Sequence, residues 1–172
     1  MIVKFRIISG ETDDFVRDIE IPSDSSFLDL HLSIQAACDF DDSMMASFYL
    51  SDADWDKGQE IVLQIIDETE QKEALLMDDL QIKQIIKAKG NRLIYMFDFF
   101  SIRFFFIEVV NIREKLPSDE KLEFPICTLC EGTPPRQILI DDLSDLDFED
   151  DIREEFNDFE DMGFENIDDY DL

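Results

Sequence analysis

The apolar and polar residues at the start of the chain alternate as they do in a β-hairpin. Apolar side chains occupy alternate positions in residues 2–9 and again in residues 15–21, and turn-forming residues fill positions 10–13. Two alternating segments joined by a short polar connection are typical of antiparallel strands. The sequence therefore predicts that the fold opens with such a pair.

The apolar period then lengthens to three and four residues, which indicates a helix. Pro22 ends the second strand, and the serines at positions 25 and 26 supply hydroxyls suited to an N-cap. Apolar residues follow at helical spacing, at Phe27, Leu30, Ile34, Ala37 and Cys38. We expect one face of this helix to pack on the sheet.

Four further strands and a second helix follow. Residues 46–51 and 60–66 have strand character, and residues 92–99 and 102–112 are apolar enough on both faces to be central strands covered on both sides. A short helix with its apolar residues within 80–86 lies between the two pairs of strands, with Asp78 or Asp79 before it and Gly90 after it. Residues 124–137 show no regular period and are predicted to be irregular.

Charge divides the 172-residue chain into a body and an acidic extension. Residues 141–172 contain sixteen Asp or Glu residues and a single base, Arg153, and so carry fifteen of the 28 net negative charges. Residues 1–140 are numerous enough to bury one hydrophobic core. We therefore expect one domain over residues 1–140, followed by an acidic, aromatic C-terminal tail over residues 141–172.

Apolar residues recur in this tail at intervals of four, four and three, at Phe148, Ile152, Phe156 and Phe159. They would line one side of a helix, but repulsion between acids four residues apart opposes such a helix in isolation. The tail is therefore expected to be disordered or to dock as an amphipathic helix. A solubilising tail, a segment docked on the body and a recognition segment for a basic protein all fit this pattern.

The composition also limits partners and location. A pI near 4.1 argues against direct binding of nucleic acid and of anionic membranes, since both require clustered Lys and Arg. Residues 93–110 are long enough to span a bilayer, but they contain Asp98, Arg103 and Glu108. Three cysteines make no disulfide framework, and the N-terminus lacks a signal-peptide pattern. These features predict a cytoplasmic protein.

Phenylalanine is concentrated in one short segment, where six of the ten residues from 97 to 106 are Phe. On a strand, Phe104 and Phe106 would face one side and Phe105 the other, so both sides need cover. The acidic tail or a second subunit would supply it, which makes a homodimer one expected arrangement.

Few residues are candidates for catalysis. His31 is the only imidazole, so any mechanism that uses histidine depends on it, although a lone His on an apolar helix is more often a packed residue. Asp41 and Asp42 could pair or bind a cation, whereas adjacent acids at a helix end are usually solvated turn residues.

Asp98 is a different kind of candidate because it lies between Phe97 and Phe99. An acid among apolar strand residues must reach solvent or find a base, and Arg92 and Arg103 are the nearest bases. We expect an ion pair first and a functional acid second. The sequence contains no P-loop, dinucleotide-binding, nucleophile-elbow or His-Glu metal motif.

Cys127 and Cys130 have the spacing of half a zinc site, for which His31 and Cys38 would have to supply the other half. Two turns of helix separate His31 from Cys38, about 10 Å along the axis, whereas ligands lie about 2 Å from a zinc ion. Zinc is therefore disfavoured, and no metal or other cofactor is expected.

Three blocks of the sequence resemble the hallmarks of one family. The first block, residues 30–48, contains Phe-Asp-Asp-Ser at 40–43, and the second, residues 90–99, ends in an aromatic residue, Asp98 and Phe99. The third consists of Pro125, Cys127, Gly132, Pro134 and Pro135. Over residues 2–137 the chain resembles the plasmid pRiA4b ORF-3-like family, also described as insertion-element passenger proteins of the TnpR type.

The resemblance implies an α+β fold, with a mixed or antiparallel sheet and two helices packed mainly on one face, to which this chain adds its acidic C-terminal extension. It also implies a link to mobile elements. The chain departs from the family pattern at several positions, which here are Phe40, Met44, Phe100, Ser101, Arg103, Phe105, Arg136 and Gln137, and most polar members of the pattern have become apolar or have changed sign. These departures imply that much of any polar site of the family is lost.

The sequence thus favours a non-enzymatic cytoplasmic protein that acts through contacts with another protein, which the charge suggests is basic. Two alternatives stay open. One is a degenerate or unrecognised enzyme centred on His31 and Asp98, with Asp41 and Asp42 nearby. The other is a DNA-mimicking inhibitor of a basic DNA-binding protein.

Overall fold

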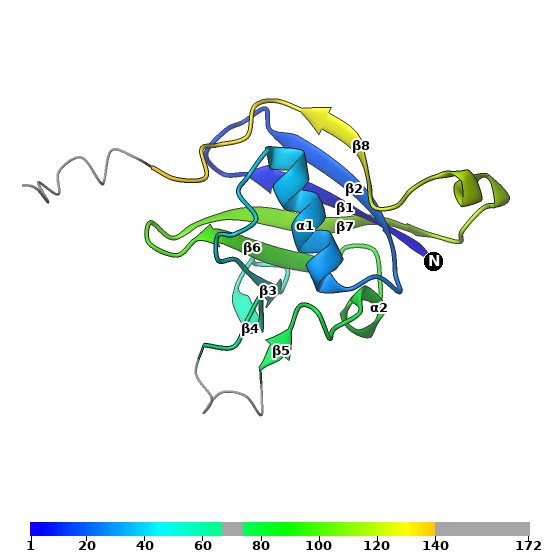
Figure 1. Cartoon of the computed structure of the whole chain (residues 1–172), viewed down its shortest axis with the longest axis horizontal. Helices are drawn as coiled ribbons and strands as arrows, with labels where there is room; N and C mark the ends of the chain where they lie inside the picture. The colour runs from blue at the N-terminus through cyan, green and yellow to red at the C-terminus, as the bar shows by residue number, and fades with distance from the viewer. Residues whose placement is uncertain (67–73, 140–172) are drawn as a thin grey trace, which may run out of the picture. The chain divides into compact units, whose positions relative to one another are not determined.

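The computed structural model of the protein describes residues 1–66 and 74–139, which form a twisted sheet flanked by helices (Figure 1). Its elements in chain order are β1 Ile2–Ser9, β2 Val16–Pro22, α1 Phe27–Cys38, β3 Ser47–Ser51, β4 Lys57–Val62, β5 Leu75–Leu76, α2 Ile82–Ile85, β6 Arg92–Asp98, β7 Arg103–Arg113, the 3₁₀ helix η1 Pro117–Lys121 and β8 Ile126–Glu131. Residues Met1–Gln137 make up one compact unit.

The strands form one mixed sheet in the order β5-β4-β3-β6-β7-β1-β2-β8. Every neighbouring pair is antiparallel except β4 and β5, which are parallel. The predicted opening hairpin is confirmed, since Ile2 pairs with Pro22 and Ile8 with Val16. With its helices, this sheet confirms the predicted α+β fold.

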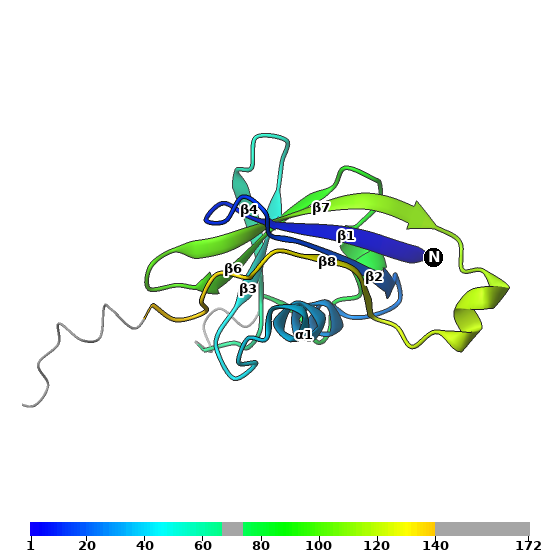
Figure 2. The ribbon, with the colours of Figure 1, turned by 90° about the horizontal axis from the view of Figure 1, so that it is seen from above.

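Helix α1 lies across one face of the sheet, on the near side in Figure 1 and below the sheet in Figure 2. Ser26 and Asp29 form a capping box at its start, in which each side chain accepts a hydrogen bond from the other residue's backbone N–H. The predicted apolar positions Phe27, Leu30 and Ile34 are buried. The sequence therefore specified both the start of the helix and its buried face.

The short helix α2 is joined to the start of α1 through backbone hydrogen bonds. Phe27 N–H donates to the Leu80 carbonyl, and Ile82 N–H donates to the Ser25 carbonyl, each over 2.9 Å. Ile82 is fully buried and belongs to the same hydrophobic core as Phe27. Both helices thus contribute to one core.

The opposite face of the sheet is covered unevenly. Ile94 and Met96 of β6 are buried on it, but Phe104 and Phe106 of β7 are only partly buried there. In Figure 2 the connection between β3 and β4 rises on this side, and the Trp55 ring on it meets Phe106 edge to face at 4.8 Å. The prediction that both faces of these strands are covered is therefore confirmed for β6 and wrong for β7.

Strand β8 corrects the prediction that residues 124–137 are irregular. It pairs with β2, but the register shifts between Asp18 and Ile19, so that Leu129 pairs with Asp18 and Cys127 with Ile19. This bulge leaves Thr128 without a register partner on β2 and breaks the alternation of apolar residues. Strand β4 also differs from its prediction, since it begins at Lys57 rather than at residue 60.

No helix within residues 1–66 and 74–139 is long and apolar enough to cross a membrane. The predicted acidic tail, including Phe148, Ile152, Phe156 and Phe159, lies outside the residues that the structure describes.

Candidate functional site

His31 lies on the buried face of α1, fully inaccessible to solvent. Its Nδ1 is 2.7 Å from the Tyr95 hydroxyl, which also accepts a 2.5 Å hydrogen bond from the Gln35 side-chain amide. The Tyr95 hydroxyl therefore links the imidazole of His31 to the side-chain amide of Gln35.

The Nε2 atom of His31 has no hydrogen-bond partner among the residues that the structure describes. Burial lowers the pKa of His31 below its ordinary value, although the charge of Asp42 opposes this shift. Burial also raises the pKa of Tyr95. Both rings are therefore neutral core residues, and His31 is in the packed state that was the more common expectation for a lone helical histidine.

Asp98 occupies the end of β6, where both of its oxygens have partners. One oxygen accepts hydrogen bonds from the backbone N–H groups of Phe100 and Ser101, at 3.0 and 3.1 Å, which closes the turn into β7. The other oxygen lies 3.5 Å from Arg103 Nη1. The predicted ion pair is confirmed with Arg103, while Arg92 pairs with Glu108 at 3.1 Å.

Arg103 connects Asp98 to two distant parts of the chain. Its guanidinium donates two hydrogen bonds, of 2.8 and 2.9 Å, to the Glu11 carboxylate in the β1–β2 connection. It also donates to the backbone carbonyls of Arg136 and Gln137, over 2.6 and 3.3 Å. Only 8% of the Arg103 side chain is exposed, against 13% of Asp98 and 39% of Glu11, so the guanidinium is buried while its Glu11 partner reaches solvent.

Asp41 belongs to the same end of the domain. Its carboxylate accepts hydrogen bonds from the Ser43 hydroxyl and backbone N–H, which lower the pKa of Asp41. The Gln137 side chain bonds both backbone groups of Asp41: it accepts from the N–H at 2.6 Å and donates to the carbonyl at 2.9 Å. Its amide also reaches Gln35 Oε1 at 3.4 Å, which links Asp41 to the His31 network.

The structure therefore brings three of the four catalytic candidates into one region. Asp41 and Asp98 are joined through Gln137 and Arg103, and His31 is reached through Gln35. Asp42 is exposed and takes no part in these bonds. Within residues 1–66 and 74–139, no three His, Cys, Asp or Glu side chains are grouped closely enough to hold a metal ion.

Two of the three blocks that resemble the family meet here, beside a residue that follows the third. Phe40 of the first block packs against Phe97 of the second, with ring centroids 5.3 Å apart, and against Phe105 at 6.0 Å. Gln137, just after the third block, lies beside Asp41. Two positions that depart from the family pattern, Phe40 and Phe105, therefore pack together, and a third, Arg103, holds an ion pair.

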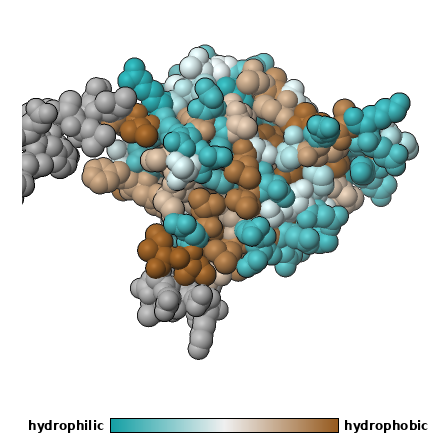
Figure 3. All heavy atoms as spheres, in the orientation of Figure 1, coloured by the Kyte–Doolittle hydropathy of each residue, from teal (hydrophilic) through white to brown (hydrophobic). Residues whose placement is uncertain are grey.

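Beyond Asp98, the connection between β6 and β7 exposes three large apolar side chains. Phe99, Phe100 and Ile102 are 43%, 95% and 63% exposed, and we refer to them as the hairpin tip. Figure 3 shows hydrophobic residues gathered at the side of the molecule where this connection and the end of β4 lie. A cavity of about 390 Å³, which Met45, Val62 and Ile65 help to line, adjoins Phe99. This end of the domain therefore has an apolar surface above a fixed polar network.

Cys127 and Cys130 lie apart from this region, on the exposed edge strand β8. The bulge pairs them with Ile19 and Arg17, whose side chains face α1, so both thiols are on the helix side of the strand. Burial raises the pKa of Cys127 and raises that of the buried Cys38 to about 12. Neither shift favours the thiolate that binds metal.

Arg17 is a structural residue that sequence reasoning missed. It is buried, and its guanidinium donates to the carbonyls of Ala37, Glu131 and Gly132 over 2.9, 2.5 and 3.1 Å. It thereby ties the end of α1 to the end of β8. The available signal was a charged residue at an inward position of the alternating second strand.

Comparison with known proteins identifies a family and a solved structure that resemble this chain. The plasmid pRiA4b ORF-3-like family matches residues 2–140. Among solved structures, a protein of unknown function from Methanosarcina mazei Go1 has a TM-score of 0.59 and 23% identity, and the similarity covers 75% of this chain and 68% of that one. No curated protein matches. Since the family match spans most of the chain, this protein belongs to the plasmid pRiA4b ORF-3-like family.

Proposed function

We propose that this chain is a non-enzymatic cytoplasmic protein that acts by binding another protein, with the hairpin tip as one contact surface. The exposure of Phe99, Phe100 and Ile102 on a short, fixed connection carries the proposal. Burying one such side chain in a partner contributes about 1.5 to 3 kcal/mol. Exposed aromatic residues grouped in this way are characteristic of binding surfaces.

The underlying polar network supports binding rather than turnover. Asp98 and Arg103 are bonded to each other. Asp98 also bonds the backbone of the hairpin, and Arg103 bonds the backbone of residues 136–137. His31 is buried among core residues, where a substrate could meet it only if α1 moved. These groups keep the hairpin in one conformation, which lowers the entropy that a partner must remove on binding.

The charge of the whole chain supports a basic partner. A net charge of −28 attracts cationic surfaces, and more than half of that charge belongs to residues 141–172. Within this extension, Phe148, Ile152, Phe156 and Phe159 would supply apolar contacts beside the acids. The extension is thus proposed as a second contact, and a location in the cytoplasm fits three cysteines that are all free thiols.

Variants of the full chain, immobilised and exposed to lysate, would test the hairpin tip. We expect Phe100→Ser to lose a set of proteins that the unaltered chain captures. Leu116→Ser is the matched control, because Leu116 is also exposed but lies beside η1, away from the tip. If both variants capture what the unaltered chain captures, the hairpin tip is not a contact surface.

A chain truncated after Ile140 tests the extension separately. We expect it to keep the partners that depend on Phe100 and to lose basic partners held by residues 141–172. If truncation changes nothing, the acidic extension has no role in recognition. Capture of a DNA-binding protein that DNA then displaces would favour the DNA-mimic alternative.

The enzyme alternative depends on Nε2 of buried His31, which has no hydrogen-bond partner within residues 1–66 and 74–139. An activity found in the purified chain and abolished by His31→Ala, with the fold unchanged by circular dichroism, would overturn the non-enzymatic proposal.

A further inference from the structure

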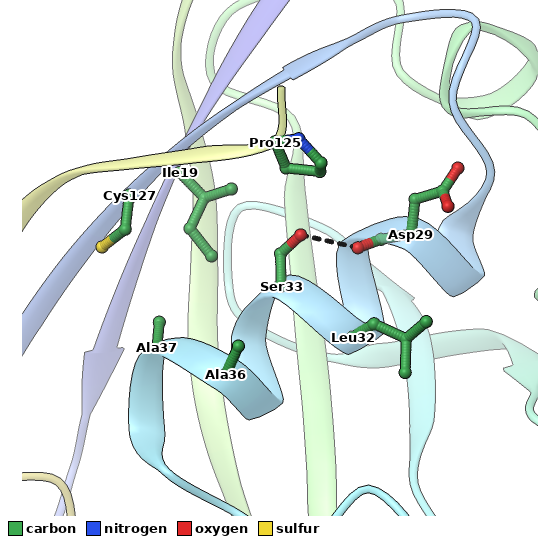
Figure 4. A pocket seen from close by; sticks show the side chains of 8 residues that line it. All are labelled: Ile19, Asp29, Leu32, Ser33, Ala36, Ala37, Pro125 and Cys127. Carbon is green, nitrogen blue, oxygen red and sulfur yellow. Dashed lines mark hydrogen bonds between the residues drawn. The ribbon is translucent and has the colours of Figure 1, made fainter. Parts of the chain in front are cut away.

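A groove separate from the hairpin tip runs between α1 and β8 (Figure 4). Its volume is about 500 Å³. Leu32, Ala36 and Ala37 of α1 form one wall, Pro125 and Cys127 form the other, and Ile19 of β2 lies at the base. On the helix side, Ala36 and Ala37 leave room in the groove, because the side chain of alanine is only a methyl group.

The polar groups in this groove are already bonded within α1. The Ser33 hydroxyl donates to the Asp29 carbonyl over 2.7 Å, and Asp29 accepts the N-cap hydrogen bond from Ser26. Leu32 projects at the rim, where 42% of it is exposed. The groove therefore suits an apolar side chain better than a polar one.

Strand β8 borders the groove and forms one edge of the sheet. It is last in the strand order, and among the described residues no strand pairs with its outer edge. Natural proteins usually guard such edges with Lys, Pro or very short strands. The six residues of β8 contain no Lys and no Pro, and its one bulge leaves Leu129, Cys130 and Glu131 in regular register with β2.

The exposed charged side chains at this site are acidic. Among the described residues, Asp29 is the charged residue that lines the groove and Glu131 the charged residue of β8, whereas the nearby Arg17 is buried and bonded to backbone carbonyls. Glu131 pairs with Val16 and so points away from the groove, so an extended segment that reached both acids would bind best with Lys or Arg alternating with its apolar residues. The acidic C-terminal extension of this chain has the opposite composition, so it would be repelled.

We infer that β8 and the α1–β8 groove form a docking site for an extended segment of another protein, in which apolar residues alternate with Lys or Arg. Its backbone pairs with the free edge of β8, and one apolar side chain enters the groove beside Ala36 and Cys127. Recognition of this kind combines main-chain hydrogen bonds for affinity with a side-chain pocket for specificity. The site deepens the proposed protein-binding function but uses no residue of the hairpin tip.

A phage-displayed library of random peptides, selected on the full-length chain at moderate salt, tests this site directly. We expect enriched peptides to alternate apolar residues with Lys or Arg. A synthetic copy of the best peptide should protect from hydrogen exchange whichever of the neighbouring Cys130 and Glu131 amides faces the free edge, because successive amides of a strand point to opposite edges and these residues lie in the regular part of β8.

Ala36→Trp fills the groove, and Ala88→Trp places the same side chain on another exposed alanine away from it. Peptide affinity should fall at least about tenfold in Ala36→Trp, equivalent to about 1.4 kcal/mol, and stay the same in Ala88→Trp. Exchange protection in the core of each free variant verifies that it is folded. Phe100→Ser should bind the peptide with unchanged affinity. Failure of the hairpin-tip proposal could therefore be told apart from failure of the β8 docking site.

Failure to enrich any peptide would overturn the inference, as would an enriched peptide that binds Ala36→Trp with unchanged affinity. Self-association of the full chain that Ala36→Trp abolishes would assign the site to a second copy instead. Tighter peptide binding after truncation at Ile140 that depends on the groove would assign it to the chain's own extension.

Discussion

At the scale of single residues, the buried polar side chains of this protein differ in how many partners they have. Among the described residues, His31 has one hydrogen bond, to Tyr95, whereas Arg103 bonds two carboxylates and two carbonyls. When a buried titratable group has few hydrogen bonds, the stability of the fold depends on its protonation state. When a buried charge has many hydrogen bonds, the stability depends on keeping both the charge and its partners. These two residues therefore predict different behaviour.

His31 should make stability depend on pH. Its pKa in the folded chain is below the value of about 6.5 expected in the unfolded chain, so the unfolded chain binds more protons near pH 6. Its contribution to stability is complete above about pH 6.5 and is lost as pH falls toward the folded pKa, by up to about 1.4 kcal/mol per pH unit.

Urea unfolding at about pH 7.5 and about pH 5.5 measures this dependence. His31→Gln keeps a polar side chain near Tyr95 but does not titrate, so the fall in unfolding free energy should be smaller in this variant. An equal fall in both proteins would mean that His31 is not the titrating group.

Arg103→Met should destabilise the fold and release residues 136–137. Asp98 would keep its charge in a largely buried position without the guanidinium, a loss of about 3 kcal/mol. Lys83→Met is the control, because the Lys83–Asp24 pair is exposed on both sides and should contribute little. Denaturant unfolding compares the two, and equal effects would show that burial does not decide the importance of these pairs.

At the scale of elements, local sequence predicted what neighbouring residues determine. The opening hairpin and α1 followed from alternation, turn residues and a capping pair within a few positions of each other. Strand β8 did not, because the bulge at Thr128 hides its period and its pairing with β2 is more than 100 residues distant. Long-range pairing of this kind leaves no local signal.

The contacts of the candidate site were also predictable where they are local in the sequence and not where they are long-range. The Asp98–Arg103 pair was predictable because an acid between phenylalanines needs a nearby base, and the two residues are five positions apart. The bonds from Gln137 to Asp41 span 96 positions and carry no such signal. Arg17 was visible as an inward charge, but its carbonyl partners belong to α1 and the end of β8.

The junction after β8 gives a prediction for this element. Gly132 has a φ of +69°, and an added Cβ would lie 2.4 Å from the Asp14 carbonyl oxygen. Gly90 also has a positive φ, of +89°, but an added Cβ would meet nothing within 4 Å. Comparing alanine at both positions separates backbone strain from steric clash.

Gly90→Ala should cost about 1 kcal/mol, which is the strain of a left-handed backbone alone. Gly132→Ala should cost more, on the order of 3 kcal/mol, because the carbonyl cannot move without disturbing β2. Hydrogen exchange should also show β8 opening more often in Gly132→Ala. Similar losses in both variants would mean that the β8 junction shifts easily.

At the scale of the whole molecule, apolar contacts and charge are concentrated in different parts of the chain. The hairpin tip is an apolar surface of the domain, while residues 141–172 hold fifteen of the 28 net negative charges. Hydrophobic burial is strengthened or little changed by salt, whereas attraction between exposed charges is screened. If a partner bound both surfaces, added salt would therefore weaken its contact with residues 141–172 but not its contact with the hairpin tip.

Raising NaCl from about 0.05 M to about 0.5 M shortens the range of electrostatic attraction from more than 10 Å to a few ångströms. Proteins held by the acidic extension should elute from the immobilised full chain over this range, and the chain truncated after Ile140 should not have retained them. Proteins held by the hairpin tip should stay bound to both forms and be missing only from Phe100→Ser. Elution of all captured proteins at one salt concentration, from both forms, would mean that a single surface accounts for binding.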